Sequence, residues 1–115
     1  MKIVRLFLAG LAGSAVFLRA AELSEVAQSP KYAWSGVAVS KTGRIFVEFP
    51  RFQDLDGNPS VAEIRPDGTL RPFPGGAWNE WAPGKPAGNA FVSTNALHLF
   101  ESDPDSLWVI DTAAP

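Results

Sequence analysis

The sequence contains no cysteine and a single histidine, His98. Without thiols, the chain has no means of forming a disulfide framework, a zinc–thiolate centre or a thiol nucleophile. His98 stands between Leu97 and Leu99 in an apolar stretch, a setting typical of a structural histidine. Stability must therefore come from apolar packing, either within the chain or against a neighbour.

Motifs of several common reaction classes are also missing. The chain has no Gly-x-Ser-x-Gly elbow, no phosphate-binding glycine loop and no two-histidine metal signature. Hydrolase-triad, nucleotide-dependent and zinc-protease chemistry therefore have no support in these residues. The sequence holds no self-sufficient catalytic set.

The sequence also lacks clustered positive charge. The 115 residues carry ten Lys and Arg against twelve Asp and Glu, which gives a formal net charge of −2 at pH 7. Lys2, Arg5 and Arg19 lie near the N-terminus, so the rest of the chain is mildly acidic. Nucleic acids and anionic lipid surfaces are recognised by clustered Lys and Arg, and we expect neither as a partner.

Residues 1–20 have the pattern of a secretory signal peptide. Lys2 and Arg5 precede a mainly apolar run over residues 6–18, and small residues follow as cleavage positions. The run is shorter than the ~20 apolar residues that a membrane-spanning helix needs, which argues against the alternative of a membrane anchor. We therefore expect a secreted or periplasmic protein that does not contact the membrane after cleavage.

From residue 21 onward, short β-rich runs alternate with clusters of Gly, Pro, Asn and Asp, and helical periodicity is weak. This pattern predicts an all-β fold. Residues 35–40 and 44–49 are predicted to form a hairpin, because the three residues between them end in a glycine that permits positive φ. Phe46 alternates with Ile45 and Val47, so apolar side chains point to both faces and both faces should meet other elements.

Two further strands are predicted to complete this sheet. Residues 60–64 and 69–73 flank a tight turn with the proline and glycine placement typical of β-turns. Pro72 and Pro74 have no N–H to donate to a neighbouring strand, which places the last strand at a sheet edge. The result is a four-stranded antiparallel meander.

A second hairpin is predicted after an irregular segment at residues 74–89. Its strands cover residues 91–100 and 106–111, with a turn at residues 102–105. One four-stranded sheet per repeat, with a proline in the outermost strand, is the pattern of β-propeller blades. The chain then supplies about one and a half blades, and a blade cannot bury both of its faces alone.

Four segments resemble the Yellow and major royal jelly protein family in order and spacing. They are WSGVAVS (34–40), GRIFVEFPRF (43–52), the Trp78–Asn79 pair and LWVIDT (107–112). Because cysteine is absent, the chain is similar to a bacterial branch of that family related to dopachrome tautomerase. The resemblance implies a secreted six-bladed β-propeller of the gluconolactonase-like kind, with residues 21–115 as its N-terminal part.

The resemblance further implies that the chain is a truncated piece of such a domain. After Asp111 and Thr112 the family pattern continues into glycine, whereas this chain reads Ala113-Ala114-Pro115. We therefore expect a fragment that is inactive on its own. A short protein that functions independently is the alternative.

In propellers the ligand-facing rim is built from connections at one end of the blades. Such a rim would receive residues from three connections: Tyr32 and Trp34; Arg51, Phe52, Asp54 and Asp56; and Trp78, Asn79, Trp81 and Asn95. The candidate ligand-binding residues are Trp34, Arg51, Trp78, Asn79 and Asn95. Aromatic faces, amides and a guanidinium suit a small aromatic or amine ligand. For the tryptophans, packing between blades is the alternative role.

No cofactor and no metal site are predicted from the residues themselves. Residues 54–58 alternate oxygen-bearing side chains like a calcium loop, but the sixth and twelfth positions are Pro59 and Arg65 instead of glycine and a carboxylate. A solvated turn is the better interpretation. A divalent metal enters only if the protein is lactonase-like, with Glu48 or Asn95 as contributors.

Two functions of different kinds follow from the resemblance. The first is small-molecule binding, with an aromatic or amine ligand. The alternative is a propeller enzyme of the dopachrome tautomerase-like or gluconolactonase-like type, which depends on the resemblance alone because a shared fold does not establish a shared activity.

Overall fold

The computed structural model describes residues 21–51 and 57–113. Within these ranges it contains strands, turns, loops and one short 3₁₀ helix, so the all-β prediction is confirmed. The elements in chain order are β1 (Gly36–Val39), β2 (Ile45–Glu48), β3 (Val61–Ile64), β4 (Leu70–Pro72), η1 (Gly76–Asn79), β5 (Thr94–Phe100) and β6 (Asp103–Asp111).

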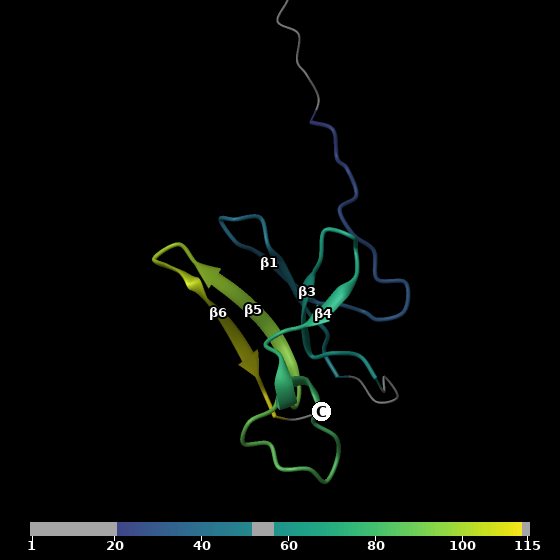
Figure 1. Cartoon of the computed structure of the whole chain (residues 1–115), viewed down its shortest axis with the longest axis vertical. Coiled ribbons are helices and arrows are strands. Elements are labelled where there is room, and N and C mark those ends of the chain that lie inside the picture. Colours follow the sequence, from purple (N-terminus) through teal and green to yellow (C-terminus); the bar gives the residue numbers. More distant parts are fainter. Residues whose placement is uncertain (1–20, 52–56, 114–115) are drawn as a thin grey trace, which may run out of the picture.

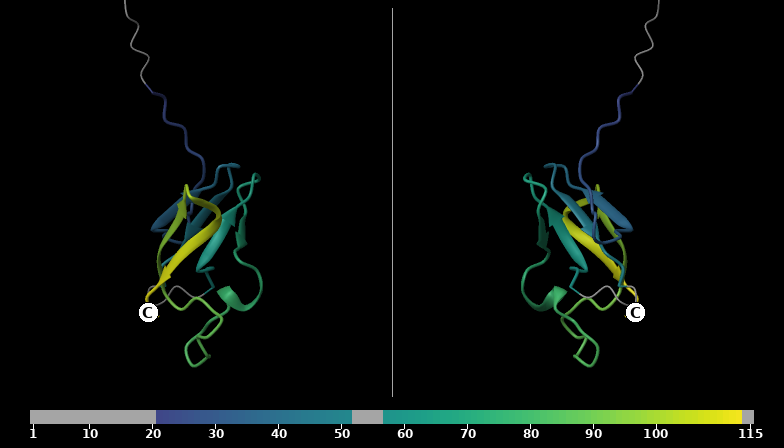
Figure 2. Two further views of the ribbon diagram at one scale, coloured as in Figure 1. Left: turned by 90° about the vertical axis from the view of Figure 1, so that its left-hand side faces the viewer. Right: turned by 90° about the vertical axis from the view of Figure 1, so that its right-hand side faces the viewer.

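The six strands form two antiparallel sheets (Figure 1). Sheet A has the order β1-β2-β3-β4, which is the predicted meander with its proline-containing strand at the edge. Sheet B is the hairpin β5-β6. Strand β5 contacts β1 and β2, so sheet B packs against the β1–β2 side of sheet A (Figure 2).

The second hairpin differs from its predicted bounds at both ends. Its first strand begins at Thr94 instead of residue 91, because the N–H groups of Val92 and Ser93 donate to the Asp111 carboxylate and not to a neighbouring strand. The turn predicted at residues 102–105 is wrong, since β6 begins at Asp103. Pro104 fits within β6 because this strand has a neighbour on one side only.

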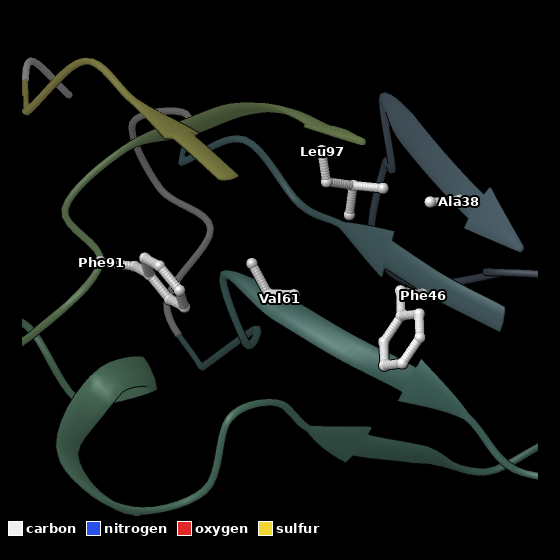
Figure 3. Packing of buried hydrophobic residues seen from close by; sticks show 5 residues of the cluster. All are labelled: Ala38, Phe46, Val61, Phe91 and Leu97. Atoms are coloured by element: carbon white, nitrogen blue, oxygen red, sulfur yellow. The ribbon is translucent and has the colours of Figure 1, made fainter. Parts of the chain in front are cut away.

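Both faces of sheet A carry buried apolar side chains, as the alternation in β2 predicts. On the inner face, Phe46 and Val61 join Leu97 of sheet B in one buried cluster (Figure 3). On the outer face, Val47 and Phe49 form a second buried cluster, which the segment before β1 partly covers. The molecule thus has two small cores, one on each side of sheet A.

The two ends of the sheets are built differently. At one end, short turns connect β1 to β2, β3 to β4, and β5 to β6. At the opposite end lie the entry into β1, the connection that follows β2, and the long segment from β4 through η1 to β5 (Figure 1). All three connections that the sequence assigns to a rim therefore lie at one end of the sheets.

One ion pair crosses from the start of β2 to β3. The Arg44 guanidinium donates two hydrogen bonds to the Glu63 carboxylate, at 2.8 and 3.0 Å. These hydrogen bonds lower the pKa of Glu63, against the opposing effect of its partial burial. Arg44 is about half exposed, so the pair contributes no more than about 0.5 kcal/mol.

Replacing Glu63 with glutamine is therefore expected to cost about 0.5 kcal/mol at pH 7. A carboxyl whose folded-state pKa is depressed stabilises the fold above its unfolded pKa, and this contribution is lost as pH falls through the folded pKa. The difference between the parent and Glu63→Gln should therefore begin to shrink near the unfolded pKa of about 4.3 and be lost once pH is below the lowered folded-state pKa. A series of urea denaturations from about pH 7 down to about pH 2 measures it, and a difference that does not change over this series would contradict the assignment.

The signal peptide predicted at residues 1–20 lies outside the described residues. In the part of the chain that the structure describes, no helix combines the length and the hydropathy of a membrane span.

Candidate ligand-binding cleft

An open cleft of about 460 Å³ lies at the rim end of sheet A. It is bounded by the residues that follow β2, by the approach to β3, by the end of β4 and by the segment around η1. The side chains that give it chemical character are those of Arg51, Asn58, Asn79, Glu80 and Trp81.

Arg51 and Trp81 form a rigid pair on one wall of the cleft. The guanidinium carbon of Arg51 lies 5.3 Å from the centre of the Trp81 ring, a cation–π contact. Arg51 also donates from Nε to the carbonyl of Val92 at 3.0 Å, and Trp81 donates from Nε1 to the carbonyl of Lys85 at 3.0 Å. Because each side chain is tied to backbone, the pair offers a preorganised aromatic and cationic surface.

Asn58 contributes a buried acceptor that has no partner within residues 21–51 and 57–113. The residue is 8% exposed, and its Oδ1 receives no hydrogen bond from this part of the chain. Its Nδ2 makes one long contact, 3.5 Å to the carbonyl of Pro59. Buried polar atoms are nearly always satisfied, so an unpartnered oxygen in a residue that lines the cleft is a candidate acceptor for a ligand donor.

Asn79, although it lines the cleft, is committed to the backbone. Its Oδ1 accepts from the N–H groups of Ser60 and Val61, at 2.9 and 3.0 Å. Its Nδ2 donates to the carbonyls of Phe73 and Pro74, both at 3.3 Å. The amide thereby joins η1 to the end of β4 and to the start of β3, and this structural use leaves it little capacity for a ligand.

The other three predicted site residues lie elsewhere at the same end of the sheets. Trp78 packs on Phe91, with ring centres 5.2 Å apart. Trp34 packs on Phe49 on the outer face of sheet A. Asn95 is exposed and donates to Thr112 Oγ1 at 2.9 Å.

Of the five predicted residues, the structure thus brings Arg51 and Asn79 into one cleft and leaves three outside it. The predicted rim residues Phe52, Asp54 and Asp56 lie outside the described residues. Asn58 and Glu80 were not predicted for the site. Glu80 directly follows the Trp78–Asn79 pair, and Asn58 is the last residue of the loop that was compared with a calcium loop. Their positions next to motifs already singled out in the sequence were the signal that could have identified them as cleft residues.

The described residues hold no cluster of metal-ligating side chains. Within residues 21–51 and 57–113, no group of three or more His, Asp or Glu side chains comes together. Glu48 is fully buried with its Oε1 hydrogen-bonded to the Ser35 hydroxyl, and Asn95 is held by Thr112. Glu48 Oε2 has no hydrogen-bond partner among the described residues, but Glu48 belongs to no group of three or more such side chains there.

Comparison with known proteins identifies no relative of this chain. No family model, no curated protein and no solved structure matches the chain. The resemblance to the Yellow and major royal jelly family stays a prediction. The case for a function therefore depends on the geometry of the cleft.

Proposed function

We propose that the protein is an exported, Yellow-like propeller piece whose cleft binds a small aromatic amine. The observation that carries this proposal is the cleft itself, which is lined both by the Arg51–Trp81 pair and by Asn58, whose Oδ1 has no partner among the described residues. An aromatic ring packs on the indole, and an amine N–H donates to Asn58 Oδ1. The exposed carboxylate of Glu80 on the same cleft balances the ammonium charge against the Arg51 guanidinium.

The cleft is shallow and open, and in this proposal it forms one wall of a larger site. Two sheets packed face to face, with a proline-containing edge strand in the first, are what the first one and a half blades of a propeller require. Further blades would close the cleft from the side. Alone, the chain is proposed to bind weakly and to have no catalytic activity.

The propeller-enzyme alternative stays a prediction without a specific observation in its favour. His98 is exposed on sheet B and packs against Phe100, with ring centres 4.5 Å apart. It does not line the cleft.

Titration of the purified chain with phenethylamine, followed by amide and indole NMR shifts, tests the proposal. We expect dissociation constants on the order of 1 mM, with the largest shifts at Arg51, Asn58 and the Trp81 indole N–H. Cyclohexylethylamine keeps the amine and removes the aromatic ring, and 3-phenylpropionate keeps the ring and reverses the charge. Both should bind at least about tenfold more weakly, a difference of about 1.4 kcal/mol.

Trp81→Ala and Arg51→Ala should each abolish the saturable shifts. Arg65→Ala is the matched control, because Arg65 is exposed in the β3–β4 turn at the opposite end of the sheet, and it should bind like the parent. Equal responses to phenethylamine and cyclohexylethylamine, or shifts that avoid all three cleft residues, would refute the proposal.

A further inference from the structure

The inner faces of the two sheets pack against each other, and part of each outer face is exposed. On the inner side, Phe46 of sheet A and Leu97 of sheet B share one buried cluster (Figure 3). On the outer face of sheet A, Val37 and Val39 are 64% and 60% exposed, and on the outer face of sheet B Trp108 is 57% exposed. Contiguous exposed apolar groups of this kind mark contact surfaces.

The two outer faces differ in shape. The outer face of sheet A is hollowed into an apolar groove of about 500 Å³, lined by Trp34, Val37, Ile45, Val47 and Ile64 together with other residues of β1 and the 25–27 segment. The outer face of sheet B instead presents projecting side chains. Phe100 and Trp108 pack edge to face with ring centres 5.9 Å apart, and Ile110 beside them is 62% exposed.

The two hairpins can be aligned from the residues that close their turns, Ser40 and Arg44 in the first and Phe100 and Asp103 in the second. In β5–β6 a register shift separates this closing pair from the next one. Beyond the closing residues, the cross-strand pairs Val39–Ile45, Ala38–Phe46 and Val37–Val47 of β1–β2 correspond to Leu99–Leu107, His98–Trp108 and Leu97–Val109 of β5–β6. The side chains of one pair lie on the same face of a hairpin, and successive pairs alternate between faces. The two hairpins can therefore be compared face by face.

In this alignment, the outer face of sheet B corresponds to the inner face of sheet A, and the outer face of sheet A corresponds to the inner face of sheet B. Trp108 holds in sheet B the register position that Phe46 holds in sheet A, but Phe46 is covered by sheet B and Trp108 is exposed. Conversely, Val37 and Val39 hold in sheet A the positions that Leu97 and Leu99 use to cover Phe46. The exposed parts of the two outer faces, around Val37 and Val39 on sheet A and around Trp108 on sheet B, therefore match each other as the two inner faces do.

We propose that a second copy of the chain docks on the first, with the outer face of its sheet A covering the outer face of sheet B. Trp108 of one copy enters the groove beside Val37 and Val39 of the next. Both halves of the contact belong to every copy, so the interface is heterologous and copies add head to tail, as a closed ring or an open row. The inference stands on register and exposure and does not depend on ligand binding.

Size-exclusion chromatography with light scattering tests the assembly. The parent chain is expected to elute as species larger than the monomer, in proportions that rise with protein concentration. Val39→Glu blocks the outer face of sheet A, and Trp108→Glu blocks that of sheet B. Each variant alone should be monomeric, whereas an equal mixture should give a dimer, because each partner retains the face that the other lacks.

Ser102→Glu, an exposed change in the β5–β6 turn, is the control and should assemble like the parent. Circular dichroism checks that the variants remain folded. A parent that is monomeric at every concentration, a single variant that still self-associates, or a mixture that stays monomeric would each overturn the proposal.

The absence of native cysteine provides a second readout that does not need the charged variants. Under oxidising conditions, mixed Val39→Cys and Trp108→Cys chains should form a disulfide-linked heterodimer faster than either variant links to itself. Equal rates for the mixture and for the single variants would exclude head-to-tail docking.

Discussion

Replacing Phe46 with alanine is expected to lower the free energy of unfolding by about 3–5 kcal/mol, a large share of the total stability of a domain of this size. Phe46 is 3% exposed and lies between the two sheets, where its ring contacts that of Phe73 at 4.9 Å between centres. Alanine would leave a cavity at the main contact between sheet A and sheet B. Urea denaturation at one fixed protein concentration, followed by tryptophan fluorescence, measures the loss.

Phe46→Leu is the matched variant, because leucine fills most of the space without the aromatic contact. It should cost about 1 kcal/mol. Equal and small losses for both variants would mean that the inner faces of the two sheets are not packed together in solution.

Replacing Asn79 with alanine is expected to cost about 2–4 kcal/mol, although the residue lies on a loop. Its Oδ1 is the acceptor for the N–H groups of Ser60 and Val61, which are 2% and 0% exposed. Alanine leaves these two buried donors without a partner, and it frees η1 from the end of β4. Thermal unfolding by circular dichroism gives the shift.

Asn95→Ala provides the comparison for this loss, since the Asn95 amide is exposed and its removal should change stability by no more than about 0.5 kcal/mol. Asn79→Asp keeps the acceptor and loses the donor, so its cost should fall between the two. If Asn79→Ala were as stable as Asn95→Ala, the role assigned to Asn79 would be wrong.

The first sheet could be predicted because its signals are local. Alternation in residues 44–49, glycine in the turns and proline in the edge strand each restrict the backbone directly. The start of β5 could not be predicted in this way, because it is determined by Asp111, which lies 18 residues beyond Ser93 and takes the N–H groups that a longer strand would have used.

In the cleft, too, local features could be predicted from the sequence and long-range contacts could not. Arg51 was a candidate because of its residue type and position, but its partner Trp81 lies 30 residues away on another connection. The orphaned oxygen of Asn58 depends on burial, which no local pattern reports. Trp78 and Asn79 were candidates because of their residue types, and their contacts with Phe91 and with backbone groups also depend on residues distant in the sequence.

The contrast between the two ends of the sheets affects how such a protein can change over time. An insertion in the turn after β1 or β5 that shifts the strand pairing by one residue would move the facing side chains to the wrong side and disrupt the packed interior. The segment between β4 and β5 has no such restriction, since the backbone from Pro83 to Asn89 is exposed and outside any strand. Lineages of this chain are free to lengthen or reshape that segment, so new recognition properties can arise there while the strand framework is preserved.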